Sequence, residues 1–279
     1  MKLPPTLTAL LALTGVAPAL SAQQGLCFPA KDSHEANTFA ILSVPVAFTG
    51  SRAPGAASGV SVGVELASLP TVDATDATST ACRPGKGPEN THPIAGIVRP
   101  RIAVAVHGFV LEASWIPPVT VNEVKANLVG LAIARPFALA AGWYLGVRVH
   151  AVLGSLNAPV TCNDAALRDA TSECFGGTRS NDRWQPGVFG AEAVVGAGRA
   201  RIRPYLGVGY TMLRSRFRVD FTNAAGSTDN TQVNVDLERV ALFAGVMWRL
   251  GQSSITAEAY STPADAATAR LVVRTLVGR

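Results

Sequence analysis

The chain has few charged residues. Asp, Glu, Lys and Arg make up 15% of its 279 residues, against about 25% in ordinary soluble domains, and the mean hydropathy is +0.26. Beyond residue 22, however, no apolar run approaches the roughly 18 residues that a transmembrane helix needs. A closed β-barrel reconciles the two observations, because it satisfies its backbone internally and presents its apolar surface at every second residue.

Basic runs and enzyme signatures are missing as well. The net charge is +5, with the basic residues scattered along the chain, which argues against nucleic acid as a partner. No GxSxG elbow and no P-loop occurs, and the acidic residues between Cys162 and Cys174 lack the spacing of a calcium loop. The histidines have no zinc-site spacing; they are His34, His92, His107 and His150. We therefore expect no catalytic residue, no metal and no cofactor.

The N-terminus has the three parts of a cleaved signal peptide. Lys2 precedes an apolar run over residues 7 to 20, and Ser21 and Ala22 form a small-residue exit. We expect residues 1 to 22 to be removed on export.

An exported chain with four cysteines is expected to form two disulfides. Cys162 and Cys174 lie in one polar segment and are paired on that ground. That pairing leaves Cys27 with Cys82, which is one of three connectivities.

Alternating apolar and polar residues predict the strands. In residues 142 to 154, Trp143, Leu145 and Val147 share one face, whereas Arg148 and His150 share the other. Ten such stretches occur, at 59–69, 98–106, 109–117, 122–135, 142–155, 187–197, 201–221, 232–250, 253–262 and 267–277. Long polar connections follow the first, fifth and seventh, and short ones follow the second, fourth, sixth and eighth. We predict an antiparallel up-and-down transmembrane barrel over residues 59 to 279, with ten strands or, as the alternative, twelve.

Aromatic residues on the apolar faces are placed as an interfacial girdle. Phe109, Trp143 and Trp248 fall beside predicted short turns, and Trp115 falls at the opposite end of its strand.

The opposite strand faces collect charges that the lipid side would not tolerate. By parity they are Glu65, Arg101, Glu112, Arg148, His150, Glu192, Arg203, Glu258, Arg270 and Arg274. In a narrow barrel we expect these side chains to fill the lumen as a self-satisfied Glu and Arg network. The alternative is a polar conduit for small solutes.

The seventh and eighth strands are longer than a membrane needs. Pairing them about Gly226 sets Arg214 opposite Glu238, Arg216 opposite Asp236 and Arg218 near Asn234, as a charge ladder on a projecting hairpin. The other face of this hairpin is apolar and is expected to hold a loop or, alternatively, to receive a ligand. Its residues are Leu213, Phe217, Val219, Val233, Val235 and Leu237.

Residues 23 to 58 leave two alternatives open. Asp32 or Ser33 can cap a short helix from His34 to Ser43 that ends before Pro45, whereas residues 38 to 48 can equally form an extra strand. A Cys27–Cys82 bridge to an outer loop requires the N-terminus to descend again. The segment is therefore either a lumen plug or an eleventh or twelfth strand.

These features, with the segments Gly207-Val208-Gly209-Tyr210 and Phe243-Ala244-Gly245-Val246-Met247-Trp248, make the chain resemble the bacterial outer-membrane β-barrel proteins, which include small integrity barrels and narrow porin-like ones. The resemblance implies an outer-membrane location, contact with outer-membrane lipid and the barrel-insertion machinery, and a monomer. The expected role is structural or surface-interacting. The alternatives are a narrow channel for small solutes, a hydrophobic-ligand transporter, or a secreted soluble β-sandwich.

Outer-membrane lipid hydrolases use Ser and His on a barrel wall. The nearest pair in this chain is His150 and Ser155, which are five residues apart and so fall on opposite strand faces. We expect no enzyme.

Overall fold

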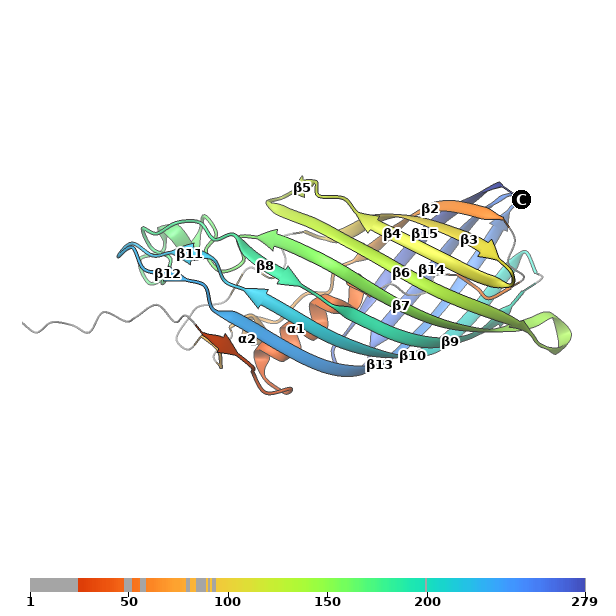
Figure 1. Ribbon diagram of the computed structural model, residues 1–279, viewed down its shortest axis with the longest axis horizontal. Coiled ribbons are helices and arrows are strands. Elements are labelled where there is room, and N and C mark those ends of the chain that lie inside the picture. The colour runs from red at the N-terminus through yellow and green to blue at the C-terminus, as the bar shows by residue number, and fades with distance from the viewer. Residues whose placement is uncertain are drawn as a thin grey trace, which may run out of the picture.

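The computed structural model describes residues 25–47, 52–55, 59–78, 81–83, 89, 91, 94–198 and 200–278. Ten strands close into one antiparallel barrel, in which each pairs with the next along the chain and the last pairs with the first (Figure 1). They are β2 (Val60–Ser68), β3 (Gly96–Val106), β4 (Phe109–Ile116), β6 (Val124–Ala138), β7 (Trp143–Ala158), β9 (Val188–Ala197), β10 (Ile202–Arg218), β13 (Gln232–Leu250), β14 (Ser253–Thr262) and β15 (Ala266–Gly278). The predicted fold and strand number are confirmed.

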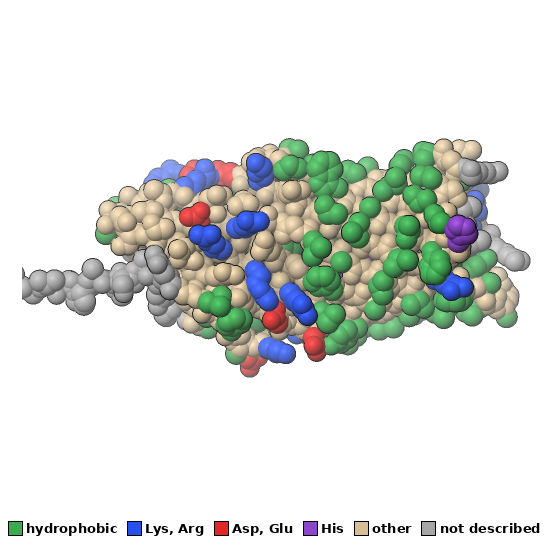
Figure 2. All heavy atoms as spheres, in the orientation of Figure 1, with side chains coloured by type: hydrophobic (Ala, Val, Ile, Leu, Met, Phe, Trp, Pro, Cys, Tyr) green, Lys and Arg blue, Asp and Glu red, His purple; other side chains and the backbone are tan. Residues whose placement is uncertain are grey.

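The alternation in β10 shows how the wall is built. From Tyr205 to Leu213 every second residue is buried, and the residues between them are exposed. Ten residues separate Ile202 from Met212, and at about 3.4 Å per residue and a tilt of about 40° they cover about 26 Å of height, close to the apolar band of outer-membrane barrels. Figure 2 shows apolar side chains concentrated over the half of the barrel with the short turns, and charged side chains toward the other half.

The two ends of the barrel differ. At one end, here called the short-turn end, β3 and β4 meet in a two-residue turn with positive φ at His107 (48°) and Gly108 (80°). The three-residue η1 (Ala140–Gly142) and residue pair 251–252 make other connections there. The opposite, long-loop end carries β5 (Thr120–Val121), η2 (Ala166–Arg168), β8 (Asp182–Gln185), β11 (Phe221–Thr222) and β12 (Thr228–Asp229).

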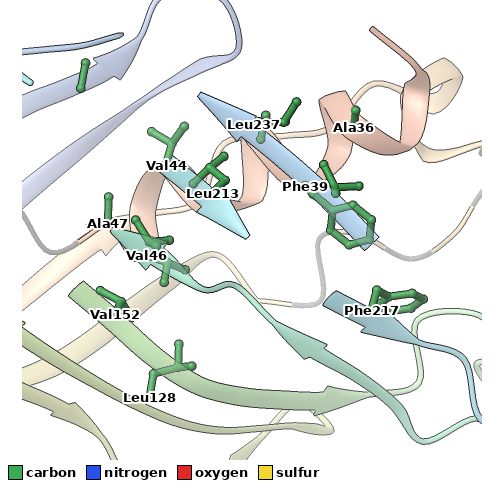
Figure 3. Packing of buried hydrophobic residues seen from close by; sticks show 14 of the residues in the cluster. Ala36, Phe39, Val44, Val46, Ala47, Leu128, Val152, Leu213, Phe217 and Leu237 are labelled. Atoms are coloured by element: carbon green, nitrogen blue, oxygen red, sulfur yellow. The ribbon is translucent and has the colours of Figure 1, made fainter. Parts of the chain in front are cut away.

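The N-terminal segment lies inside the barrel. After β1 (Leu26–Cys27), helix α1 (His34–Val46) contacts the inner sides of β10, β13, β14 and β15, and the short helix α2 (Ala74–Ala77) packs against it. Ser33 is the N-cap of α1, and its hydroxyl accepts a hydrogen bond of 3.2 Å from the Ala36 amide. Ala36, Phe39 and Val44 face Leu213, Phe217 and Leu237 of the wall (Figure 3). A helix buried on nearly all sides needs no polar face.

Two predictions about this segment change. Residues 38 to 46 are helical, so the extra-strand alternative is wrong for the described residues, and α1 runs on to Val46 instead of ending before Pro45. Pro45 is tolerated in this last turn because it removes a single intrahelical bond where the helix is about to end. The predicted signal peptide lies outside the described residues.

A second piece of the segment, residues 52 to 55, also occupies the lumen. A Cβ atom added to Gly146 or Gly196 would approach the Pro54 ring to 3.2 or 2.9 Å. These wall glycines leave room for the chain to pass. Helix α1 and residues 52 to 55 are together called the plug below.

Candidate functional site: the filled lumen

Glu65 on β2 is the centre of a buried charge network. Its carboxylate is 0% exposed and accepts hydrogen bonds from the guanidinium groups of Arg99 (Nε to Oε1, 2.8 Å) and Arg101 on β3. Arg99 lies directly opposite Glu65 in the β2–β3 register. A buried carboxylate needs such partners, because an unpaired charge in the interior is costly.

The network continues across the lumen through Glu112. Arg101 and Arg274 both reach Glu112 Oε2, at 3.3 Å and 3.0 Å. Arg148 lies 3.5 Å from Glu192, and His150 Nε2 lies 3.5 Å from the same carboxylate. His150 therefore faces a lumen carboxylate.

Glu258 forms the other branch. Arg270 lies 3.5 Å from Glu258 Oε1, and the Tyr205 hydroxyl donates a hydrogen bond of 2.8 Å to Oε2. The Arg270 guanidinium also lies over the Tyr260 ring, 4.4 Å from its centroid. All four side chains are buried.

Nine of the predicted lumen residues meet in this network, and one does not. The nine are Glu65, Arg101, Glu112, Arg148, His150, Glu192, Glu258, Arg270 and Arg274. Arg203 lies nearer the short-turn end, where its Nε donates to the Ala200 carbonyl at 2.9 Å. The prediction that Arg203 belongs to the network is wrong. Parity determines which face of the strand a side chain is on, but not its position along the barrel axis.

Three network residues were missed from the sequence. Arg99 has the same parity as Arg101, so alternation alone could have found it. Tyr205 and Tyr260 also point inward, and their hydroxyl groups could have suggested partners in a charged lumen.

Arginines of the wall hold the end of the plug. Arg99 donates to the carbonyl oxygens of Val46 (2.9 Å) and Ala47 (3.1 Å), and Arg270 donates to that of Val44 (2.9 Å). The last carbonyls of a helix have no intrahelical partner and carry its negative dipole end, so cations stabilise them. The charge network and the plug therefore form one hydrogen-bonded unit.

The long-loop end is closed by a second cluster around Arg83. Its guanidinium contacts Glu173 (2.6 Å), Asp229 (3.1 Å) and Glu89 (3.4 Å), and its side chain is 5% exposed. Both predicted disulfides, Cys27–Cys82 and Cys162–Cys174, are present. Glu35 of α1 accepts hydrogen bonds from the amides of Ala81 and Cys82. The three loops that contribute Arg83, Glu173 and Asp229 are thereby joined to one another and to the plug. These three loops are called the cap below.

Asp182 organises the cap on the side of β8. Its carboxylate accepts hydrogen bonds from the Thr161 amide (2.7 Å), the Asp220 amide (3.0 Å) and the Ser180 hydroxyl (2.8 Å). Burial raises the pKa of Asp182, and these hydrogen bonds act in the opposite direction.

The hairpin register differs from the predicted one by two residues. Arg214 lies opposite Asp236, Arg216 opposite Asn234, and Arg218 opposite Gln232, whereas Glu238 faces Met212. The physical reason is the turn: Asn223 bonds Ser227, so the hairpin is centred on Ala225, and Gly226 supplies the positive φ (79°) after it. Arg216 still reaches Asp236 diagonally, at 2.7 Å. The inner face of the hairpin packs against α1, where the Phe39 and Phe217 rings are 5.7 Å apart.

The aromatic residues assigned to the girdle all lie on the outer wall. Phe109, Trp143 and Trp248 lie near the short-turn end and Trp115 near the other, with exposed fractions of 37%, 43%, 38% and 48%. Trp115 also donates a hydrogen bond of 3.1 Å to Asn127.

A small cavity remains between α1 and the wall; its surface is mostly apolar, and Glu35, Arg83 and Asp182 are also among the residues that line it. Its volume is about 110 Å³, and Phe39 and Leu42 of the plug face Leu156, Val160 and Trp184 across it. Among the described residues no three His, Cys, Asp or Glu side chains are grouped to hold a metal ion. No helix in that part of the chain is both long and apolar enough to cross a membrane.

No protein-family model and no curated protein matches the sequence. Solved structures with similarity to the chain include the Pseudomonas putida toluene transporter TodX (TM-score 0.31, 10% identity, 79% of this chain and 68% of that one). Another is Ail, the attachment invasion locus protein of Yersinia pestis, in complex with the heparin analogue sucrose octasulfate (TM-score 0.23, 10% identity, 78% and 94%). A TodX deltaS2S3 mutant, a monoaromatic hydrocarbon channel, aligns with a TM-score of 0.32 at 10% identity, and the alignment covers 86% of this chain and 70% of that one. The closed barrel with its outward apolar band is the architecture of outer-membrane β-barrel proteins.

Proposed function

We propose that this protein is a monomeric outer-membrane barrel with a sealed lumen, and that its role is structural or surface-interacting, without catalysis. The observation that supports the seal is the set of hydrogen bonds from Arg99 and Arg270 to the carbonyl oxygens that end α1. These arginines also pair with Glu65 and Glu258. We therefore expect hydrated ions not to pass around a plug that is bonded to a buried ion network.

The proposal includes an orientation. The long-loop end, with its two disulfides, faces the cell exterior, and the short turns face the periplasm. Export by the signal peptide of residues 1 to 22, contact with outer-membrane lipid and assembly by the barrel-insertion machinery belong to the same proposal. The surface available to partners is then the cap.

Planar-bilayer recording tests the seal. We expect the wild-type protein to give no stable conductance steps. The double variant Arg99→Ala/Arg270→Ala should conduct, because it removes both contacts to the end of α1. Arg168→Ala is the matched control, since Arg168 is exposed at the end of η2 and its side chain bonds only the Asp164 carbonyl among the described residues. Stable steps from the wild-type protein, altered in selectivity by Arg148→Gln, would instead establish the narrow-channel function.

A second function, binding of a small apolar ligand, is favoured by the cavity beside Phe39. A dry apolar cavity of about 150 Å³ accepts benzene, and this one is of the same order, about 110 Å³. We expect Leu42→Phe to fill the cavity and remove any toluene-induced rise in thermal stability, whereas Val208→Phe, on the outer wall, should not. A wild-type protein that gains no stability from toluene would exclude this second function and leave the sealed-barrel proposal unaffected.

A further inference from the structure

The short-turn end of the lumen opens into a second cavity, of about 570 Å³. The basic side chains lining it are Arg52, Arg203, Arg249 and Arg274, and Ser254 lies among them. No Asp or Glu of the described residues lines it. These five residues are called the basic vestibule.

The strand register brings three of these residues into one row. Arg249 of β13 lies opposite Ser254 of β14, which in turn lies opposite Arg274 of β15. Neighbouring strands are about 4.8 Å apart, so the two arginine backbones are about 10 Å apart with the serine between them. The side chains of Arg249 and Arg274 are long enough to contact one bound group that lies between them.

Arg203 and Arg52 come from other directions. Arg203 lies opposite Met247, two residues before Arg249 on the same strand face. Arg52 is carried by the plug. The vestibule is therefore built by β10, β13, β14, β15 and the plug together, and not by one flexible segment.

Among the described residues, the basic side chains that line the vestibule outnumber the acidic side chains near them. Arg274 pairs with Glu112, and Arg52 lines a neighbouring cavity together with the same glutamate. Among the described residues, no salt bridge within 4.0 Å joins Arg52, Arg203 or Arg249 to an acidic side chain, and Arg203 bonds the Ala200 carbonyl instead. The buried network beyond them adds no spare acid, since it contains five arginines (Arg99, Arg101, Arg148, Arg270 and Arg274) and four glutamates (Glu65, Glu112, Glu192 and Glu258). Like charges confined at a low-dielectric wall repel one another, and a bound anion relieves that repulsion.

We propose that the basic vestibule binds a small phosphate-bearing anion that enters from the short-turn end. The planar guanidinium group matches phosphate oxygens in a two-point geometry, and the Ser254 hydroxyl offers a further donor. The cavity has room for more than a single phosphate group. The site shares Arg274 with the charge network and Arg52 with the plug, but anion binding from the short-turn end does not require the lumen to be sealed.

Calorimetric titration with pyrophosphate at low ionic strength, on the full protein in detergent micelles, tests this site. We expect one saturable site per chain, and about tenfold or greater loss of affinity for Arg249→Gln and for Arg203→Gln, since each removes a charged hydrogen-bond donor. Arg249→Lys should keep part of the affinity. Arg218→Gln is the control, because Arg218 is exposed at the other end of the barrel. Equal weakening by the control variant, or no wild-type binding, would overturn the proposal.

A second variant keeps the test decisive if a glutamine variant does not fold. Ser254→Glu places a carboxylate between Arg249 and Arg274, so it should abolish pyrophosphate binding and raise the thermal unfolding temperature. Its folding is checked by the change in gel migration on heating. A folded Ser254→Glu protein that binds pyrophosphate as the wild type does would rule the site out.

Discussion

Arg270 and Val44 are 226 residues apart in the sequence, and the Arg270 guanidinium donates a hydrogen bond of 2.9 Å to the Val44 carbonyl oxygen. The same guanidinium lies 3.5 Å from Glu258. One side chain of the last strand thus joins the barrel wall, the charge network and the plug. Stability and closure of the lumen are expected to depend on the same residue.

Arg270→Met is expected to destabilise the protein by about 3 to 5 kcal/mol, because it leaves Glu258 buried with one fewer cation. The double variant Arg270→Met/Glu258→Gln should recover part of that loss, since the side chain that lost its arginine is then neutral. Denaturant unfolding in micelles, followed by tryptophan fluorescence, measures both. A double variant less stable than the single one would contradict this account of the network.

Glu65→Gln tests the centre of the network. The change should lower the free energy of unfolding by about 3 to 5 kcal/mol, since two buried arginines lose their shared carboxylate. Glu238→Gln, on an exposed outer position of β13, should change it by no more than about 0.5 kcal/mol. Similar losses for the two variants would mean that the buried pairs add no more stability than surface charges.

The strands and the lumen charges could be predicted because both follow from a local signal. Alternation places Arg101, Glu112 and Arg148 inside without knowledge of any partner. The contact between Arg270 and Val44 could not be predicted in that way. It depends on how far α1 descends into the barrel, which is set by packing of Phe39 and Val44 against strands more than 160 residues away.

The errors have equally specific causes. Arg203 has the parity of a lumen residue, but the charge network occupies only the middle of the barrel. Alternation shows which face of a strand a side chain is on, and it does not show where along the barrel axis that side chain lies. The hairpin register depended on the turn, where Asn223 closes the loop and Gly226 follows its centre. Choosing the glycine as the centre shifted every cross-strand pair by two residues.

The two disulfides are expected to differ in their contribution to stability. Cys27–Cys82 spans 55 residues and Cys162–Cys174 spans 12. Loop-closure entropy then predicts losses of about 4 and about 3 kcal/mol for the respective Cys→Ser double variants. Unfolding of each, with the other bridge intact, measures the difference. Removal of Cys27–Cys82 should also increase the protease sensitivity of the N-terminal segment; an unchanged sensitivity would mean that Glu35 and the wall arginines suffice to hold it.

Tryptophan fluorescence tests the placement of the wall in lipid. Trp115, Trp143 and Trp248 are on the outer surface, whereas Trp184 points inward and donates a hydrogen bond of 2.6 Å to Ser215. In single-tryptophan variants reconstituted with lipids brominated near the glycerol end of the acyl chain, the three outer residues should be quenched strongly. A Trp184-only protein is the internal control and should be quenched least. Equal quenching of all four would be incompatible with a girdle.

The register of the projecting hairpin has a direct chemical test. Arg214 and Asp236 are cross-strand partners, whereas Arg214 and Glu238 are offset by two residues along β13. Two residues correspond to about 7 Å along a strand, and cysteine Cα atoms more than about 7 Å apart do not form a disulfide without backbone movement. The double variant Arg214→Cys/Asp236→Cys should therefore cross-link under mild oxidation, and Arg214→Cys/Glu238→Cys should not.

Non-reducing digestion and mass spectrometry distinguish the new bridge from the two native ones. The native pairs serve as controls, because Cys27–Cys82 and Cys162–Cys174 should be recovered unchanged in both variants. Preferential cross-linking of positions 214 and 238 would place the turn centre on Gly226 and would also pair Arg216 directly with Asp236. In that case the hydrogen bonds that Asn223 makes with Ser227 and Gly226 could not all form, since they require a hairpin centred on Ala225.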